Sequence, residues 1–269
     1  MTGRPTLRLG DGRSLPYTDA GGDGVPLLAL HGSFGRGANF ARAAGLLADR
    51  GVRLIAPDQR GHGHSGREDD YSAEAFVADA AAFVRALGLG PLPVLGHSRG
   101  GITAYQLAAR HPDTVSALVI EDIGPVVRRP EVEHPVLDVR GWPQTAATRE
   151  ELGAAIEARG VPDADYFLQS AEPYEDGWRL LFSWDDMMAV QESGCGDWWP
   201  DWLSSTCPAL VLHAGHSTML PAPMAHTMTQ RRPATRLMDF PRTTHWIHDD
   251  DPSGFATAVA DFVRCHSPV

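Results

Sequence analysis

One stretch decides the fold that this chain is expected to adopt: Pro93-Val94-Leu95-Gly96-His97-Ser98-Arg99-Gly100-Gly101. An apolar run of strand length leads into it, and residues 102–110 carry apolar side chains at the three- and four-residue spacings of a helix. Glycines lie two positions before and two positions after Ser98, and in so tight a turn a Cβ there would collide with neighbouring backbone. The pattern predicts a nucleophile elbow, a strained strand-to-helix turn that exposes the Ser98 hydroxyl beside free helix N–H groups.

Composition and charge narrow the class of protein. The chain has 269 residues, of which 43% are hydrophobic, enough for one large α/β domain with an insertion. Its formal net charge is −11 and it has no basic stripe, so nucleic acid and anionic membrane surfaces are poor partners. Residues 1–5 lack the apolar core of a signal peptide, and no apolar run approaches the roughly 18 residues of a membrane-spanning helix.

The three cysteines, Cys195, Cys207 and Cys265, show neither a CxxC pair nor the Cys/His spacing of a metal site. An odd number of cysteines in a chain without a leader predicts reduced thiols and a cytoplasmic location. The chain also has no phosphate-binding loop and no dinucleotide-binding glycine motif after its first strand. We therefore expect no metal and no cofactor.

Apolar runs of strand length alternate with helical stripes along much of the chain. Most of the runs are apolar throughout, which predicts a doubly wound, mostly parallel sheet covered on both faces. The first two runs read instead as an antiparallel hairpin, because glycine-rich turns flank them. The expected strands are 6–9, 14–19, 25–30, 52–56, the run before the elbow, 115–120, 209–214 and 235–240, and the clearest helices are 72–87, 222–230 and 252–265.

This alternation breaks after Pro125. Residues 126–205 hold six of the seven tryptophans and are expected to form a mainly helical cap, with helices near 148–159 and 163–171. The cap would cover the carboxyl edge of the sheet, where open α/β sheets bind ligands, and residues 1–125 and 206–269 would form the core. The aromatic content predicts an apolar, roofed pocket, although each ring alone can serve only to pack the cap onto the core. The expected substrate contacts are Phe34, Trp142, Phe182, Trp184 and Trp246.

Four motifs, taken in order, resemble the α/β-hydrolase superfamily from about residue 6 to the end. They are His31-Gly32-Ser33-Phe34-Gly35, Asp58-Gln59-Arg60-Gly61-His62-Gly63, Gly96-His97-Ser98-Arg99-Gly100, and Thr244-His245 followed by Asp251-Pro252. The resemblance implies the α/β-hydrolase fold, and capped esterases and carbon–carbon bond hydrolases are the most similar members. It also implies a catalytic serine, Ser98.

The resemblance places the catalytic base at His245, after the last strand and before the last helix. A serine hydroxyl is a weak nucleophile near neutral pH, and a neutral imidazole within hydrogen-bond reach removes its proton during attack. His248 is the local alternative. A metal site made by His245, His248 and residues 249–251 is a less favoured reading, because those three aspartates look like a charge cluster at a helix N-terminus.

The orienting acid departs from the usual pattern of the superfamily, G-x-x-D-x-x-x-P. The corresponding segment is Gly215-His216-Ser217-Thr218-Met219-Leu220-Pro221, so Thr218 stands where the carboxylate is expected. Some members, such as haloalkane dehalogenases and certain esterases, carry the acid after the strand that follows the elbow, and Asp122 falls at that place. Glu121 is the reserve, since adjacent strand residues point to opposite faces and only one of them reaches the histidine. The alternative is that Asp122 merely caps the strand end.

An oxyanion site needs two N–H groups aimed at the developing negative charge. The resemblance supplies the amides of Ser33 and Arg99, with Phe34 as the less favoured substitute for Ser33. The Arg99 guanidinium is expected to point outward to bind an acid. The other possibility is that it points inward to meet a carboxylate on the substrate.

These residues lead to one main functional hypothesis and three alternatives. The main hypothesis is a serine hydrolase that cleaves a small or medium apolar ester or lactone through an acyl-enzyme, and that is a monomer or a homodimer. A carbon–carbon bond hydrolase and a cofactor-free dioxygenase, which uses the His–Asp pair as base, share the same fold. The non-catalytic alternative is a ligand-binding pseudo-hydrolase, and its motive is Thr218.

Overall fold

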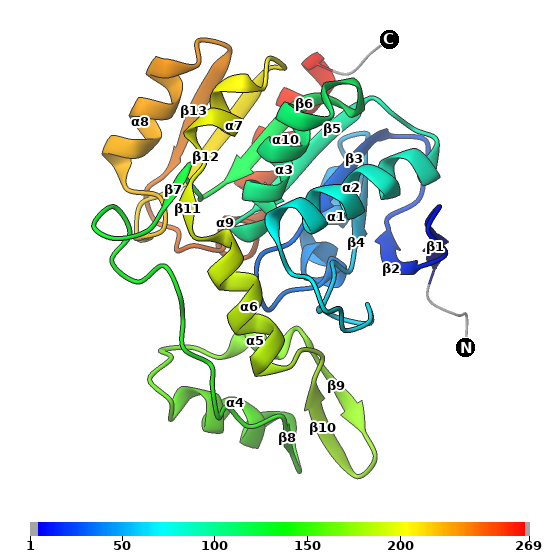
Figure 1. Ribbon diagram of the computed structural model, residues 1–269, viewed down its shortest axis with the longest axis vertical. Helices are drawn as coiled ribbons and strands as arrows, with labels where there is room; N and C mark the ends of the chain where they lie inside the picture. The colour runs from blue at the N-terminus through cyan, green and yellow to red at the C-terminus, as the bar shows by residue number, and fades with distance from the viewer. Residues whose placement is uncertain (1–4, 267–269) are drawn as a thin grey trace.

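The computed structural model describes residues 5–266, and its central element is an eight-stranded sheet in the order β1-β2-β4-β3-β5-β6-β12-β13 (Figure 1). The first two strands form the expected antiparallel hairpin, and β2 pairs antiparallel with β4. The pairs from β4 across to β13 are all parallel. The strands are β1 (Thr6–Arg8), β2 (Ser14–Asp19), β3 (Val25–Leu30), β4 (Val52–Pro57), β5 (Leu92–His97), β6 (Val115–Glu121), β12 (Ala209–Ala214) and β13 (Thr235–Phe240).

Alternate residues of each inner strand face two different cores, as expected for a sheet covered on both sides. In β3, Leu28 and Leu30 belong to one buried cluster, whereas Leu27 and Ala29 belong to the other. The first cluster includes side chains of α2 (Ala73–Leu87), α3 (Arg99–Arg110) and α8 (Ala222–Arg231). The second includes side chains of the short helix η1 (Gly37–Phe40), α1 (Ala41–Ala48), α9 (Ile247–Asp250) and α10 (Pro252–His266). The predicted fold class is therefore confirmed.

Local signals set the ends of α2. The Ser72 hydroxyl accepts a hydrogen bond from the N–H of Ala75, which satisfies one of the free donors at the helix start. The helix ends at Gly88, whose φ of 67° places it in the left-handed region that glycine adopts without penalty. Both ends follow from residues that are visible in the sequence.

Residues 126–205 form several small elements, most of which extend away from the sheet as a second lobe (Figure 1). In that lobe β8, β10 and β9 make a three-stranded antiparallel sheet beside α4, which the sequence did not predict. The predicted helix at 148–159 is present as α4, whereas α5 covers four residues because the chain enters β9 at Ala171. The elements are β7 (Val126–Val127), β8 (Thr145–Ala146), α4 (Arg149–Glu157), α5 (Asp165–Leu168), β9 (Ala171–Tyr174), β10 (Gly177–Leu180), α6 (Trp184–Gly194), β11 (Gly196–Asp197) and α7 (Trp199–Ser204).

The far end of this segment returns to the core. Trp202 of α7 is fully buried, and its ring lies 6.1 Å from that of Tyr105 on α3. Its indole N–H donates to the carbonyl oxygen of Met228 on α8. The cap boundaries at residues 126 and 205 stay a prediction, since α7 packs as part of the sheet's own helical layer.

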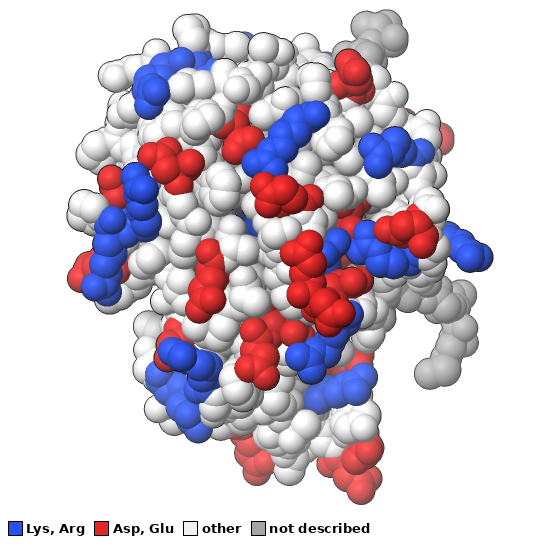
Figure 2. Space-filling view, viewed as in Figure 1, with Lys and Arg blue, Asp and Glu red and all other residues white. Residues whose placement is uncertain are grey.

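The face shown in Figure 2 carries acidic and basic side chains, which are interspersed over both lobes. Several form ion pairs, such as Arg110 with Asp201 and Arg67 with Asp186. This face is in keeping with the expectation that nucleic acid is no partner, which stays a prediction. Within residues 5–266, no helix combines the length and the apolar character that a membrane crossing requires.

Candidate active site

Ser98 lies at the turn between β5 and α3 in a backbone conformation that side chains rarely adopt, with φ 52° and ψ −121°. Close packing explains the flanking glycines. A Cβ on Gly96 would lie 2.3 Å from the Gly100 carbonyl oxygen, and a Cβ on Gly100 would lie 2.0 Å from that of Leu30. The turn has the strain expected from the G-x-S-x-G pattern, and Ser98 lines a cavity of about 1040 Å³.

The sheet brings the other candidate residues to the same edge, because the carboxyl ends of parallel strands meet there. Ser33 follows β3, Asp122 follows β6, and His245 lies in the loop after β13. The backbone N–H of Ser98 donates to the Glu121 carbonyl oxygen, and the His97 Nε2 lies 3.0 Å from the His245 carbonyl oxygen. Ser98 and its neighbour His97 therefore contact the acid-bearing and the histidine-bearing segments, respectively.

The His245 imidazole pairs with Asp122, the residue predicted from the β6 position. His245 Nδ1 lies 2.7 Å from Asp122 Oδ2, and the carboxylate is fully buried. The other carboxylate oxygen accepts a hydrogen bond from the N–H of Ala214, at the end of β12. Thr218, at the superfamily's usual acid position, is exposed. An acid is thus supplied to His245 from β6.

Glu121, the reserve acid, pairs with the competing histidine instead. The His248 Nδ1 and backbone N–H lie 2.8 and 2.9 Å from Glu121 Oε1, and both side chains are buried. Burial alone would lower the pKa of His248, but the Glu121 carboxylate raises it overall. Two neighbouring carboxylates thus meet two histidines three residues apart, His245 in the loop after β13 and His248 in α9, as expected for residues that point to opposite faces of a strand.

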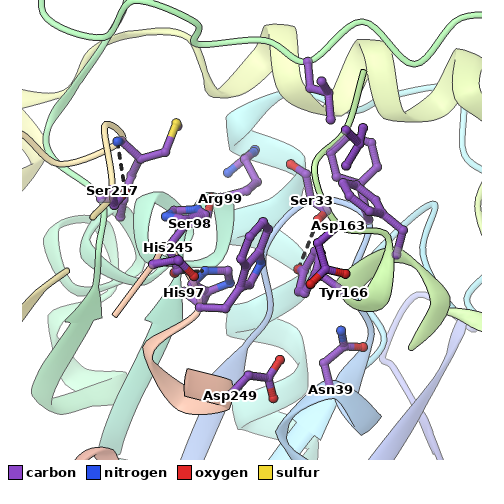
Figure 3. A pocket seen from close by; sticks show the side chains of 18 of the residues that line it. Ser33, Asn39, His97, Ser98, Arg99, Asp163, Tyr166, Ser217, His245 and Asp249 are labelled. Carbon is purple, nitrogen blue, oxygen red and sulfur yellow. Dashed lines mark hydrogen bonds between the residues drawn. The ribbon is translucent and has the colours of Figure 1, made fainter. Parts of the chain in front are cut away.

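His97 connects the elbow with this loop. Burial, with His245 and His248 nearby, holds the pKa of His97 well below its ordinary value, so its imidazole is neutral. A neutral ring next to a carbonyl oxygen donates its Nε2–H, here to His245. Ser98 and His245 both line the cavity (Figure 3), and no hydrogen bond joins their side chains. Such bonds often form only with substrate bound.

The loop after β3 lies against the elbow. A Cβ on Gly32 would lie 2.8 Å from His97 Nδ1 and 3.1 Å from Ser98 Cβ, so only glycine fits. The Gly32 carbonyl oxygen faces away towards the His31 Nδ1 and the N–H of Gly35, 2.8 and 3.2 Å distant. Because a peptide's C=O and N–H point in opposite directions, the N–H of Ser33 faces the other way.

The Arg99 side chain does not point outward, so that expectation is wrong. Arg99 is 3% exposed, and its guanidinium lies over the Phe76 ring with Cζ 4.1 Å from the ring centre. Nη1 donates to Thr103 Oγ1 at 2.9 Å, and Nη2 lies 3.5 Å from Ser193 Oγ on α6. Burial lowers the pKa of Arg99 to about 10, which leaves the side chain charged at neutral pH. Residues of α6 lie over the Arg99 side chain, and the sequence around the elbow gives no sign of this packing. The Arg99 N–H, as the first of α3, has no intrahelical acceptor.

Two of the five predicted aromatic contacts line the cavity, and three lie behind it. Phe34 and Trp246 are on the lining. Trp142 stacks behind Phe34, with ring centres 6.4 Å apart, and Phe182 meets the edge of Phe34 at 5.4 Å. Trp184 packs against the same cluster. Trp142 and Phe182 therefore support Phe34, and none of the three rings is part of the cavity lining. The apolar lining also includes Ile102, Ile123, Val127, Leu137, Val161, Tyr166, Phe167 and Met219.

The sequence gave no indication of the contacts that α5 makes with the site loops. The Tyr166 hydroxyl donates to the Ser33 carbonyl oxygen at 3.1 Å (Figure 3). The Gln169 carbonyl oxygen accepts from Arg36 Nε, and its side-chain amide donates to Asp249 Oδ2. One short helix thus bonds both the loop after β3 and the loop that carries His245. A tyrosine in a loop-rich segment offers no pattern from which this contact follows.

Metal ligation finds no support in the described part of the chain. Within residues 5–266, no three or more His, Cys, Asp and Glu side chains are grouped so that they could hold a metal ion. His245 and His248 each face a carboxylate at the end of β6. The loop is therefore built around two histidine–carboxylate pairs.

Known proteins resemble this chain along nearly its whole length. A protein-family model described as alpha/beta hydrolase fold matches residues 25–152. The sn-1-specific diacylglycerol lipase ABHD11 of Mus musculus is 31% identical, over 94% of this chain and 87% of that protein. The structure of E-2-(acetamidomethylene)succinate hydrolase is similar with a TM-score of 0.84 at 24% identity, covering 97% of this chain and 98% of that one. A marine microorganism esterase has a TM-score of 0.78 at 27% identity, covering 92% and 98%.

Proposed function

The chain belongs to the alpha/beta hydrolase family and is a hydrolase of that fold, and from this premise we propose that it is a serine hydrolase acting on small or medium apolar esters or lactones. Ser98 is the nucleophile, His245 the general base and acid, and Asp122 the residue that orients and stabilises the imidazolium. The amides of Ser33 and Arg99 hold the oxyanion. A cytoplasmic location, and a monomer or homodimer, remain parts of this proposal.

The proposed reaction has two halves. Ser98 Oγ attacks the carbonyl carbon while His245 Nε2 takes its proton, and the carbonyl oxygen becomes an oxyanion between the two amides. The intermediate collapses, the alcohol leaves with the proton from His245, and an acyl-enzyme remains. Water, activated by the same imidazole, then releases the acid and restores the serine.

One observation carries the proposal: the 2.7 Å contact between His245 Nδ1 and Asp122 Oδ2. It fixes the proton on Nδ1 and leaves Nε2 as the basic atom on the cavity side. The motive for a non-catalytic pseudo-hydrolase was the missing acid at Thr218, and this contact removes that motive. The relatives described as a lipase and an esterase act on esters, which supports the same substrate class here.

The cavity supports an apolar substrate of moderate size. A volume of about 1040 Å³ is just above the usual range for small-molecule sites, roughly 300–1,000 Å³. Phe34, Trp246 and several aliphatic side chains line part of it, so an acyl chain lying against them would be stabilised by burial. We therefore expect rates on 4-nitrophenyl alkanoates to rise from the acetate towards medium chain lengths.

A fluorophosphonate probe tests the proposal, because it labels only a serine that a neighbouring base activates. We expect wild-type protein to be labelled and Ser98→Ala to be unlabelled. Ser253→Ala, which changes an exposed serine at the start of α10, is the matched control and should be labelled like wild type. Wild-type protein that resists the probe while remaining folded would contradict the assignment of Ser98 as a nucleophile.

A further inference from the structure

Arg99 presents a buried positive charge that no carboxylate neutralises. Within residues 5–266, no Asp or Glu oxygen forms an ion pair with it, and its two side-chain acceptors are the neutral hydroxyls of Thr103 and Ser193. The Nε atom is buried and has no hydrogen-bond partner at all. The two other arginines buried to a similar degree have full-strength acceptors. Arg60 pairs with Asp79 at 2.8 Å, and Arg232 donates to the carbonyl oxygens of Ser205 and Cys207 and to the Thr235 hydroxyl.

An isolated buried charge is costly, and proteins usually pair such charges or use them. The Phe76 ring gives partial compensation by a cation–π contact on one face of the guanidinium. That contact leaves the N–H donors around the edge of the group unaffected. The side chain is therefore short of an acceptor for at least one of its donors.

The under-used edge of the guanidinium is the one formed by Nε and Nη2. Nη1 has a good bond to Thr103, whereas the Nη2 contact with Ser193 is at the 3.5 Å limit. A Cβ on Gly194 would lie 3.0 Å from Arg99 Cδ and 3.4 Å from Nε. Both Gly194 and Arg99 line the cavity, together with Ile102 and Gln191. Nε itself has almost no solvent-accessible surface, so Gly194 of α6 separates this edge from the open cavity. A substrate group that enters beside Gly194 would reach the edge once α6 moves aside.

We propose that the Nε–Nη2 edge of Arg99 is a seat for a carboxylate of the substrate, so that the preferred esters carry one anionic end. The proposal rests on the proposed function, which it narrows from apolar esters to monoanionic ones. Two parallel N–H groups match the two oxygens of a carboxylate, and the bond is strongest where water is excluded. The long contact to Ser193 would be exchanged for a charged one.

Charges elsewhere on the cavity limit the substrate to a single anionic group. Asp163, Asp165, Asp249 and Asp250 line the same cavity, and three of them are exposed to solvent. Besides Arg99 the lining holds one arginine, the exposed Arg42, whose Nη1 lies 3.5 Å from the Asp249 carbonyl oxygen, so acidic side chains outnumber basic ones there. Figure 3 shows Asp163 and Asp249 drawn apart from Arg99. A second carboxylate would meet these acidic side chains, so dianions should be poor substrates.

Matched pairs of esters test whether this edge of Arg99 binds a substrate carboxylate. The probes are 4-nitrophenyl monoesters of the straight-chain dicarboxylic acids from adipic to suberic, each compared with its methyl ester, in which the carboxylate is masked. For the best chain length we expect kcat/KM to favour the anion at least about tenfold. Arg99→Met should abolish this ratio and Arg99→Lys should keep part of it. The ratio is the readout, since the same residue's N–H belongs to the proposed oxyanion site.

A second variant covers the case in which Arg99→Met fails to fold. Gly194→Ala adds a methyl group against Arg99 Cδ and Nε, so the anion-to-neutral ratio should fall while the charge remains. A ratio near one in wild type, or a ratio that Arg99→Met and Gly194→Ala leave unchanged, overturns the seat.

Loss of the proposed function is a separate outcome. If wild type cleaves neither ester, calorimetry with monomethyl adipate and dimethyl adipate decides the matter without turnover. Tighter binding of the anion that Arg99→Met or Gly194→Ala removes supports the seat. Equal binding of the two compounds contradicts it.

Discussion

At the scale of single residues, the structure shows which carboxylate pairs with His245, which the sequence motifs left open. Thr218 stands at the superfamily's usual acid position, yet His245 has a buried carboxylate partner in Asp122. Glu121, one residue away, points to the opposite side and holds His248. The strand alternation that separates these two carboxylates could be predicted, and so could the pairing of one of them with His245. The partner of the other could not.

Asp122→Asn is expected to lower kcat by roughly 10³- to 10⁴-fold, as loss of the orienting acid does in serine proteases. The amide cannot stabilise an imidazolium, and it offers an N–H where His245 Nδ1–H needs an acceptor. Steady-state kinetics on a 4-nitrophenyl ester measure the change.

Thr218→Ala is the matched control, because this exposed side chain occupies the position from which the acid is absent. We expect its kcat to stay within about threefold of wild type. A larger loss in Thr218→Ala than in Asp122→Asn would reverse our assignment of the acid.

At the scale of elements, the parallel strands were the most predictable part. The strands β3, β12 and β13 begin and end at the predicted residues, because each is an apolar run between turn residues. The β9–β10 hairpin was missed, since Pro173 interrupts one strand and neither strand alternates clearly. The direction of the Arg99 side chain also could not be predicted. It depends on α6, which lies about ninety residues later and contributes Ser193 and Gly194.

Among the elements, α5 offers a test of how the second lobe acts on the chemistry. Tyr166→Phe removes the hydroxyl that holds the Ser33 carbonyl oxygen, and with it part of the support for the loop after β3. We expect kcat to fall by about tenfold with little change in KM, because the lost hydroxyl holds the loop of the proposed oxyanion donor, whereas the ring that lines the cavity is kept.

Tyr174→Phe is the control for this substitution, since it removes an exposed hydroxyl from β9 of the same lobe. Its kinetics should match those of wild type. Equal kinetics for Tyr166→Phe and wild type would show that α5 has no part in positioning Ser33.

At the scale of the whole molecule, the balance of buried histidines sets how stability depends on pH. Burial holds the pKa values of His31, His62 and His97 below the ordinary value. Their contribution to stability is present above about pH 6.5, the unfolded value, and is lost as the pH falls, because the unfolded chain then binds more protons. His248 has a raised pKa, so its contribution is present below about pH 6.5 and is lost as the pH rises through its folded value.

Since three histidines oppose one, we expect the free energy of unfolding to fall as the pH is lowered from 6.5 to 5. Each buried neutral histidine contributes a slope of up to about 1.4 kcal/mol per pH unit in this window. Urea unfolding at a series of pH values measures it. His62→Gln should show a shallower slope than wild type, and His226→Gln, which changes an exposed histidine, should not. Stability that rises as the pH falls would contradict this balance.

The fold of the whole chain was predictable because its evidence is spread over many segments. The alternation of apolar runs and helical stripes, and four motifs in order, each point to the same sheet. The second lobe has no such redundancy, and its small elements depend on contacts with one another. The site lies between these two cases, because its sheet-edge residues follow from strand order whereas its roof does not.

Four non-glycine residues in the described range 5–266 have a positive φ, and three of them, Phe34, Ser98 and Asp122, belong to this site. Such conformations cost on the order of 1–3 kcal/mol each, which glycine at the same positions would largely avoid. Selection for the reaction therefore favours the present side chains at these three positions, whereas selection for stability favours glycine. A lineage that no longer needs the reaction but must still keep its protein folded would gain from exchanging any of the three for glycine, so it should lose the chemistry before it loses the architecture.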